Sequence, residues 1–197
     1  MIWYPYEQLK TMKAPYEIVD ANGVYLYTKD QKMIDSVSSW WSVIHGYKHP
    51  VINQAIISQV EKFSHVMLGG LTHEPARKLS EKLASWLPGD LDYCFFSDSG
   101  SVAVEVSLKM ALQYYMNRGD EKRTMILALE HAYHGDTFKT MEAGDDEDYH
   151  FVLKAYGTSP DVVHIPTETA ALEEAFEKYH DRLNCMLGEP LLQGAAC

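Results

Sequence analysis

The chain has 197 residues, of which 46% are hydrophobic and 23% are charged, a composition typical of a globular protein with a real core. Its 17 basic and 28 acidic residues give a formal net charge of −11 without any basic cluster, which argues against a nucleic-acid partner. No apolar run approaches the roughly 18 to 20 residues that span a bilayer, and the N-terminus lacks the apolar core of a signal peptide. A cytoplasmic location is therefore the default expectation.

The first half of the chain predicts a small antiparallel sheet followed by two helices. Residues 16–37 alternate apolar and polar side chains around an Asn-Gly pair, which is typical of a meander of short strands. The apolar positions after Pro50 fit an amphipathic helix. A second helix is predicted over residues 74–87, ahead of a Pro-Gly pair.

Strand and helix patterns alternate from residue 93 onward. Strands are predicted over residues 93–97, 124–129, 162–165 and 185–187, and helices over residues 102–117 and 168–179. Because this alternation favours a mostly parallel sheet covered on both faces, the predicted fold class is α/β. Ligands of such sheets bind at the carboxyl ends of the strands.

The polar turn over residues 97–101 joins a predicted strand to a predicted helix. At a helix N-terminus, unpaired N–H groups and the helix dipole favour an anion, while Gly100 lets the backbone approach closely and serine hydroxyls add donors. A bound phosphate is one interpretation. Capping of the helix by Ser99 or Ser101 without any ligand is the other, and the local pattern leaves both open.

The metal-binding residue types form no recognisable site. The three cysteines lack metal-ligand spacing, so they are interpreted as reduced and structural. The acidic run over residues 145–148 is typical of a solvated loop rather than a calcium loop. Two histidine pairs, at positions 45 and 49 and at positions 131 and 134, lack the ligands that would complete a metal site.

Four separated strings have to be explained together. They are YPY at 4–6, SSWWSVIHGYKHP at 38–50, SDSGSVAVEVSLKMA at 97–111 and AYHGDT at 132–137. In this order and spacing they resemble the class III pyridoxal-phosphate aminotransferases of fold type I, and the Trp-Trp string is most similar to the branch that acts in biotin biosynthesis.

This resemblance covers essentially the whole chain and implies a domain organisation. Residues 1–49 would form the N-terminal segment of the family's small domain, with the antiparallel meander. Residues 50–197 would form the first part of the large domain, which binds pyridoxal phosphate on a mostly parallel sheet.

The resemblance also implies a role for each matching site residue. Gly100 and Ser101 match the pair that holds the cofactor phosphate. Tyr133 matches the aromatic residue that stacks on the cofactor ring and borders the substrate pocket, for which a flat phenol is suited. Trp40 and Tyr6 match residues that contact substrate.

Three further positions bear on this site. Asp136 follows the His-Gly pair and is expected to orient pocket residues. Glu189 resembles a glutamate that ends a strand near the cofactor, although a surface carboxylate also accounts for it. Tyr4 stands where the family has the histidine of a His-Pro-Tyr string, a departure that affects the match at Tyr6.

The implied reaction moves the amino group of S-adenosylmethionine to 8-amino-7-oxononanoate and gives 7,8-diaminononanoate, with pyridoxal 5'-phosphate as cofactor in a homodimer. In this family the Schiff-base lysine and the aspartate at the pyridine nitrogen belong to segments beyond Glu189, and no lysine here has the matching context. We therefore expect an N-terminal portion of a longer enzyme, inactive and poorly soluble by itself.

Other functions stay open at this point. One is a class III transaminase that acts on an omega-amino acid or a diamine. Another is a non-catalytic fragment that binds pyridoxal phosphate or another phosphate ligand, or that regulates the complete enzyme by dimerising with it. A nicotinamide-binding fold is least favoured, because no Gly-x-Gly-x-x-Gly follows a predicted strand.

Overall fold

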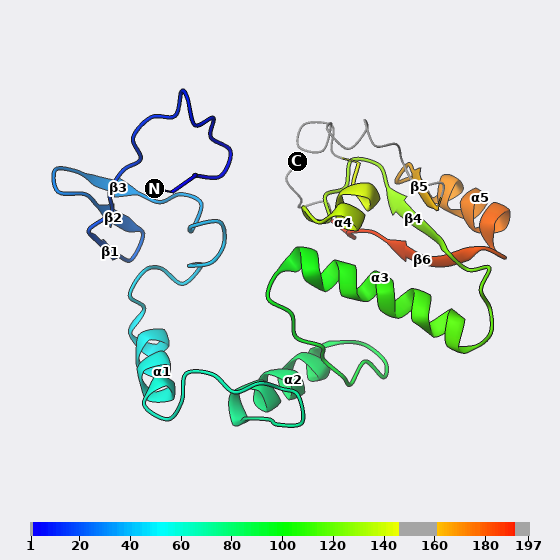
Figure 1. The fold of residues 1–197 in the computed structure, drawn as a ribbon, viewed down its shortest axis with the longest axis horizontal. Coiled ribbons are helices and arrows are strands. Elements are labelled where there is room, and N and C mark those ends of the chain that lie inside the picture. Colours follow the sequence, from blue (N-terminus) through cyan, green and yellow to red (C-terminus); the bar gives the residue numbers. More distant parts are fainter. Residues whose placement is uncertain (1, 146–160, 192–197) are drawn as a thin grey trace. The chain divides into compact units, whose positions relative to one another are not determined.

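The computed structural model describes residues 2–145 and 161–191, and it divides the chain into two compact units, Met1–Leu87 and Pro88–Cys197. Figure 1 shows the elements of each unit. The resemblance predicts a different division, with a domain boundary between residues 49 and 50. That boundary stays a prediction. No helix in the described ranges is both long enough and apolar enough to cross a membrane.

The N-terminal unit begins with an antiparallel sheet of three short strands. Strands β1 (Asp20–Asn22), β2 (Tyr25–Tyr27) and β3 (Lys32–Ile34) pair in the order β1-β2-β3, which confirms the predicted meander. Gly23 makes the first turn with a φ of +56°, a conformation that glycine adopts without steric cost. Its N–H donates to the carbonyl oxygen of Tyr47 at 3.1 Å.

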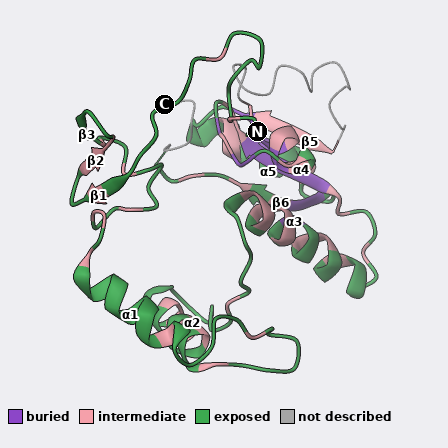
Figure 2. Ribbon diagram, turned by 60° about the vertical axis from the view of Figure 1, so that its left-hand side comes forward, coloured by how far each residue is buried: buried purple, intermediate pink, exposed green. Residues whose placement is uncertain are grey.

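Two helices follow in the same unit, close to their predicted positions. Helix α1 (Pro50–Val60) has a proline in its first turn, where the fixed φ suits a helix start. Helix α2 (Glu74–Trp86) is capped by His73, whose Nδ1 accepts the N–H of Ala76 at 3.3 Å. None of the described residues of this unit is buried, and the apolar residues of α1 are exposed (Figure 2).

The C-terminal unit contains a parallel sheet in the order β5-β4-β6. Strand β4 (Met125–Leu129) lies in the middle, between β5 (Val162–Ile165) and β6 (Leu183–Leu187). Three helices complete the unit, α3 (Gly100–Asn117), α4 (Phe138–Ala143) and α5 (Thr169–Tyr179). Helix α3 contacts β6 and α4, and α5 contacts β5. This alternation of parallel strands and helices confirms the predicted α/β class.

The core of this unit is centred on β4. Residues 125–128 are at most 4% exposed, and Leu127 forms a cluster with Ile165, Ala175 and Leu183. Figure 2 shows the buried residues gathered on the sheet. Apolar burial contributes about 25 cal/mol to stability for each Å² removed from water. This packing therefore holds β4 and its neighbouring strands in place, together with the loops at their carboxyl ends.

Residues 93–97 do not form the predicted strand. They pair with no other strand among the described residues, and Tyr93 and Phe95 are 97% and 66% exposed. An apolar run becomes a strand only when a neighbour accepts and donates its backbone hydrogen bonds. The local pattern indicates burial but cannot supply that neighbour, which is why the prediction was wrong here.

Two of the cysteines, Cys94 and Cys185, lie among the described residues. Neither forms a disulfide, and burial raises the pKa of the Cys185 thiol. Cys197 and most of the acidic run at 145–148 lie outside the described residues.

Candidate functional site

The structure at the start of α3 shows which of its two serines caps the helix. The helix begins at Gly100, and Ser99 is its N-cap, with extended backbone angles and a hydroxyl that accepts the N–H of Val102 at 3.2 Å. The carbonyl oxygen of Ser99 accepts the N–H of Ala103 at 3.0 Å. Capping therefore falls to Ser99, and the side chain of Ser101 is available for another role.

Ser101 contacts the loop after β4. Its Oγ accepts the backbone N–H of Asp136 at 3.0 Å, which leaves the hydroxyl hydrogen to donate elsewhere. Gly135 packs directly against this side chain, because a Cβ at Gly135 would lie 2.3 Å from Ser101 Oγ. Its φ of +125° is also a conformation that only glycine adopts readily. Glycine is therefore required at this point of the loop.

Tyr133 is tied to the same loop through Asp136. Its hydroxyl donates to Oδ2 of Asp136 at 2.8 Å. Asp136 thus links the start of α3, through its backbone N–H, to the tyrosine ring, through its carboxylate. Asp136 therefore contacts the tyrosine that it is expected to orient, and its role toward the pocket stays a prediction.

A pocket of about 470 Å³ brings the predicted cofactor residues together. It is lined by Gly100, Ser101, Val104, Tyr133, His134, Gly135, Leu187, Gly188 and Glu189. These residues come from the start of α3, the loop after β4 and the end of β6, so the pocket lies at the carboxyl ends of two parallel strands. Its size is in the range of about 300 to 1,000 Å³ that small-molecule sites occupy.

His134 lines this pocket, a position that the sequence did not predict for it. It is 8% exposed, and its Nε2 has no hydrogen-bond partner among the described residues. Burial lowers its pKa, an effect that the nearby Glu189 carboxylate opposes and that His164 reinforces. The ring is therefore held neutral. Its one sequence signal is its place beside Tyr133. Its pairing with His131 lacks the ligands that would complete a metal site, and no metal-ligating cluster occurs in the described part of the chain.

The donors around the pocket fit a phosphorylated aromatic ligand. Among the described residues, the backbone N–H groups of Gly100 and Ser101 donate to no acceptor. Unpaired N–H groups at the start of a helix favour a negatively charged ligand. A Cβ at Gly100 would meet no heavy atom within 4 Å, so a ligand can approach the backbone closely. The Tyr133 ring and the neutral His134 add a flat apolar face and an unused polar atom.

Tyr6 and Trp40, the predicted substrate residues, lie together in the N-terminal unit. Their ring centroids are 5.7 Å apart with an interplanar angle of 81°, an edge-to-face contact, and the residues are 75% and 62% exposed. The structure shows this pair and the pocket around Tyr133 in separate units.

The backbone around Trp40 is strained. Residues 38–41 all have positive φ, between 48° and 66°, which costs L-amino acids about 1 to 2 kcal/mol each. Such strain tends to occur at functional sites, where surrounding structure maintains it.

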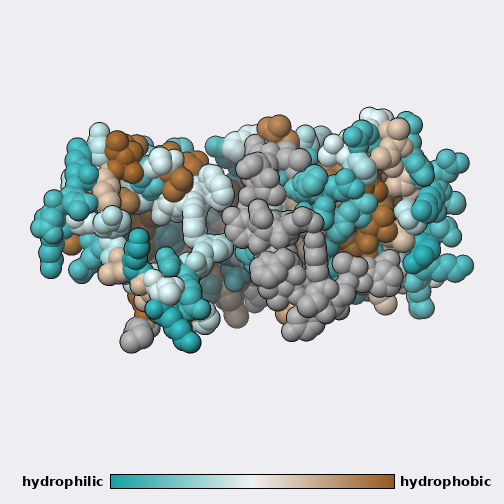
Figure 3. Space-filling view, turned by 90° about the horizontal axis from the view of Figure 1, so that it is seen from above, coloured by the Kyte–Doolittle hydropathy of each residue, from teal (hydrophilic) through white to brown (hydrophobic). Residues whose placement is uncertain are grey.

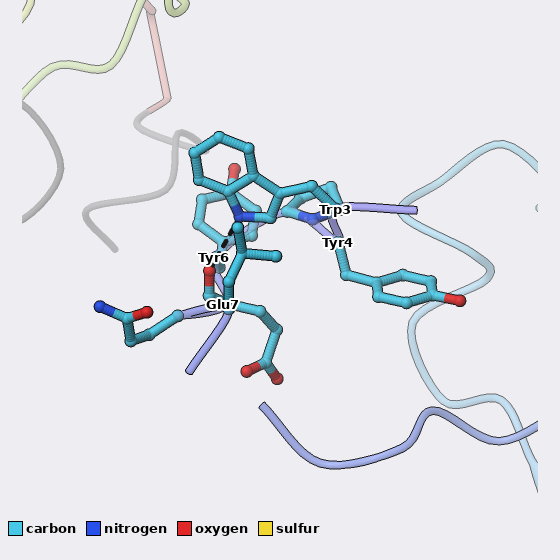
Figure 4. A pocket seen from close by; sticks show the side chains of 7 residues that line it. Trp3, Tyr4, Tyr6 and Glu7 are labelled. Atoms are coloured by element: carbon cyan, nitrogen blue, oxygen red, sulfur yellow. Dashed lines mark hydrogen bonds between the residues drawn. The ribbon is translucent and has the colours of Figure 1, made fainter. Parts of the chain in front are cut away.

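A hollow in this unit is lined by residues 3–9 (Figure 4). The indole Nε1 of Trp3 donates to the carbonyl oxygen of Glu7 at 3.1 Å, the dashed contact in Figure 4. Tyr6 also lines the hollow, while the ring of Tyr4 points away from Trp3. Tyr4, which stands where the resemblance implies a histidine, is therefore turned away from this indole.

Known proteins with similar sequences are aminotransferases. An adenosylmethionine-8-amino-7-oxononanoate aminotransferase from Buchnera aphidicola (subspecies Acyrthosiphon pisum) is 48% identical over 158 residues, which are 77% of this chain and 37% of that protein. The protein of the same name from Saccharomyces cerevisiae is 39% identical over an alignment of 221 positions, which covers 98% of this chain and 46% of the yeast protein.

Structural comparison gives the same result. The crystal structure of adenosylmethionine-8-amino-7-oxononanoate aminotransferase from Methanocaldococcus jannaschii matches with a TM-score of 0.83 and 34% identity, over 94% of this chain and 44% of that one. The chain thus spans less than half the length of these relatives. The sequence profile of the family described as aminotransferase class-III matches residues 6–194. The chain therefore belongs to the class III aminotransferase family.

Proposed function

We propose that the protein transfers the amino group of S-adenosylmethionine to 8-amino-7-oxononanoate, with pyridoxal 5'-phosphate as cofactor. The observation that carries this proposal is the pocket at the start of α3, whose donors and aromatic face match the cofactor's two ends. The relatives named for this reaction at 39% and 48% identity support the choice of substrates. Because they are more than twice as long as the part that this chain matches, the reaction is proposed for the whole protein.

The residues of the chain divide the work of holding the cofactor. The N–H groups of Gly100 and Ser101 and the Ser101 hydroxyl would bind its phosphate, because a helix start favours an anion. Tyr133, oriented by Asp136, would cover the ring. The neutral His134 would close the wall without adding a charge. When bound, the cofactor supplies the electron sink for transamination.

The substrates would meet a second group of aromatic side chains. Tyr6 and Trp40 are proposed to contact substrate, supported by their edge-to-face pairing and by the exposed faces of both rings. Aromatic rings with a polar edge suit a ligand that has an aliphatic chain and amino groups at once. A homodimer and a cytoplasmic location accompany this proposal.

Cofactor binding is tested first, by titrating the protein with pyridoxal 5'-phosphate and following absorption and tyrosine fluorescence. Pyridoxal without the phosphate serves as the control ligand, and Ser101→Ala as the control variant. We expect saturable binding of the phosphorylated form, with the affinity reduced about tenfold or more in Ser101→Ala, since hydrogen bonds to charged groups contribute most. Equal binding of pyridoxal would contradict a phosphate site at α3.

The reaction is tested by incubating the whole protein, for which it is proposed, with both substrates and the cofactor and measuring 7,8-diaminononanoate by mass spectrometry. Lysine in place of S-adenosylmethionine tests the amino donor. Failure to form product with either donor, in a preparation that binds the cofactor, would overturn the proposed substrates and leave the family assignment intact.

A further inference from the structure

Two side chains on one face of α3 accept backbone N–H groups from the same segment. Ser101 Oγ accepts the N–H of Asp136 at 3.0 Å, and Glu105 Oε1 accepts the N–H of Lys139 at 3.1 Å. Residues four apart on a helix lie one above the other. Helix α3 therefore holds residues 136–139 at two points that are one helical turn apart.

The segment held in this way leads directly to the pocket. Asp136 carries the carboxylate that accepts the Tyr133 hydroxyl, and Gly135 packs against Ser101. Any movement of residues 136–139 away from α3 would therefore change the position of the Tyr133 ring. It would also remove the contact that orients the Ser101 hydroxyl.

The contact made by Glu105 is a strong one. The residue is half-buried, and a carboxylate that accepts a backbone N–H forms a charge-assisted bond. The ammonium group of Lys139 pairs with Glu142 at 2.8 Å, within α4, so Glu105 holds this segment through its main chain. Glu105 is not one of the residues that line the pocket.

We infer that Glu105 is a positioning residue for the cofactor pocket, which it orders from outside by fixing the first turn of α4 against α3. This inference rests on the proposed function, because it assigns Glu105 a role in placing Tyr133 and Ser101 for pyridoxal 5'-phosphate. Ser101 alone anchors one point of the loop, and Glu105 supplies the second point that prevents rotation about the first.

The test compares Glu105→Gln with Glu105→Met. Both keep the length of the side chain and a good helix propensity, but only glutamine keeps an oxygen that can accept the Lys139 N–H. We expect pyridoxal 5'-phosphate to bind Glu105→Met about tenfold more weakly and with a reduced circular dichroism of the bound cofactor. Glu105→Gln should retain most of the affinity and the wild-type spectrum. Gln113→Ala, two turns further along α3, removes an exposed side-chain contact and should change neither.

A measurement on the wild-type protein makes the test independent of variant folding. If Glu105 couples the loop to the pocket, the cofactor must in turn slow hydrogen exchange at the Lys139 amide, because coupling is reciprocal. Unchanged exchange at this amide, or equal affinity and dichroism in Glu105→Met and wild type, would overturn the inference. A wild-type protein that binds no pyridoxal 5'-phosphate would instead overturn the proposed function, and this inference with it.

Discussion

A β-carbon at position 135 would lie 2.3 Å from Ser101 Oγ and 2.9 Å from Ser101 Cα, at a backbone angle that L-residues rarely adopt. The loop after β4 and the start of α3 can approach each other this closely only because Gly135 has no side chain. The orientation of the Ser101 hydroxyl therefore depends on Gly135, a residue that has no side chain.

Gly135→Ala should therefore lower the affinity for pyridoxal 5'-phosphate at least tenfold, because the added methyl group displaces Ser101. Overpacking of this kind also costs about 1 to 3 kcal/mol of stability. Gly119→Ala is a matched control, since Gly119 has a φ of +77° but open space around it. It should lose stability from backbone strain alone and keep the affinity. Equal affinities in the two variants, measured by titration, would contradict the steric argument.

The two serines at the start of α3 should respond differently to the same substitution. Ser99→Ala removes the N-cap and should lower the free energy of unfolding by about 1 kcal/mol, with little effect on cofactor affinity, while Ser99→Asp should restore stability. Ser101→Ala should lower the affinity with a smaller effect on stability. Thermal melts and titrations of all three variants separate capping from binding, and a Ser99→Ala protein with a large loss of affinity would show that the two roles are not separate.

His134 should make the stability of the protein depend on pH. Because burial lowers its pKa below the ordinary value of 6.5, the unfolded chain takes up a proton near pH 6.5 while the folded protein does not. Stability should consequently fall as the pH drops below about 6.5, by at most about 1.4 kcal/mol per pH unit from this group.

In His134→Gln the pH dependence should be shallower. Denaturant unfolding between pH 5 and 8, without cofactor, measures both proteins. Above pH 7.5 the two slopes should coincide, because the histidine is neutral in both states there. Identical slopes below pH 6.5 would show that His134 does not titrate in this way.

At the scale of elements, local patterns were sufficient where the spacing of apolar residues and the capping residues define the element. Helix α5 and strands β4 and β5 lie within a residue or so of their predicted bounds, since spacing and caps are properties of the local sequence. Residues 93–97 have an equally apolar pattern but no strand beside them among the described residues. Pairing depends on distant parts of the chain, so it cannot be inferred from the segment itself.

The same distinction applies to the site. Gly100, Ser101 and Tyr133 could be named from motif strings, and the structure gathers them in one pocket. His134 and Glu105 lie within the same strings, but nothing in the strings indicates the part that either plays. The burial of His134 and the contact of Glu105 with Lys139 arise only when α3, the loop after β4 and the end of β6 come together.

At the scale of the whole molecule, burial is distributed unequally between the two units. Every buried residue among those described belongs to Pro88–Cys197, in the sheet and in the helices and loops around it. The N-terminal unit has regular elements, but apolar side chains of α1 such as Val51, Ile56 and Val60 remain exposed. Figure 3 shows hydrophobic side chains open to solvent on the face in view. Since buried apolar contacts resist local opening, the two units should differ in stability.

Hydrogen exchange should show this difference directly. We expect the amides of β4 to be the most protected, and those of α1 and of β1 to β3 to exchange with an opening free energy lower by about 2 kcal/mol or more. The measurement is made on the whole protein at one pH, so intrinsic exchange rates can be divided out for each amide. Helix α1 is a sensitive reporter, because it forms a regular helix although none of its residues is buried. If α1 proved as protected as β4, this prediction would be wrong. The apolar side chains of α1 would then have to be covered in solution by a surface other than the described residues, which leave them exposed.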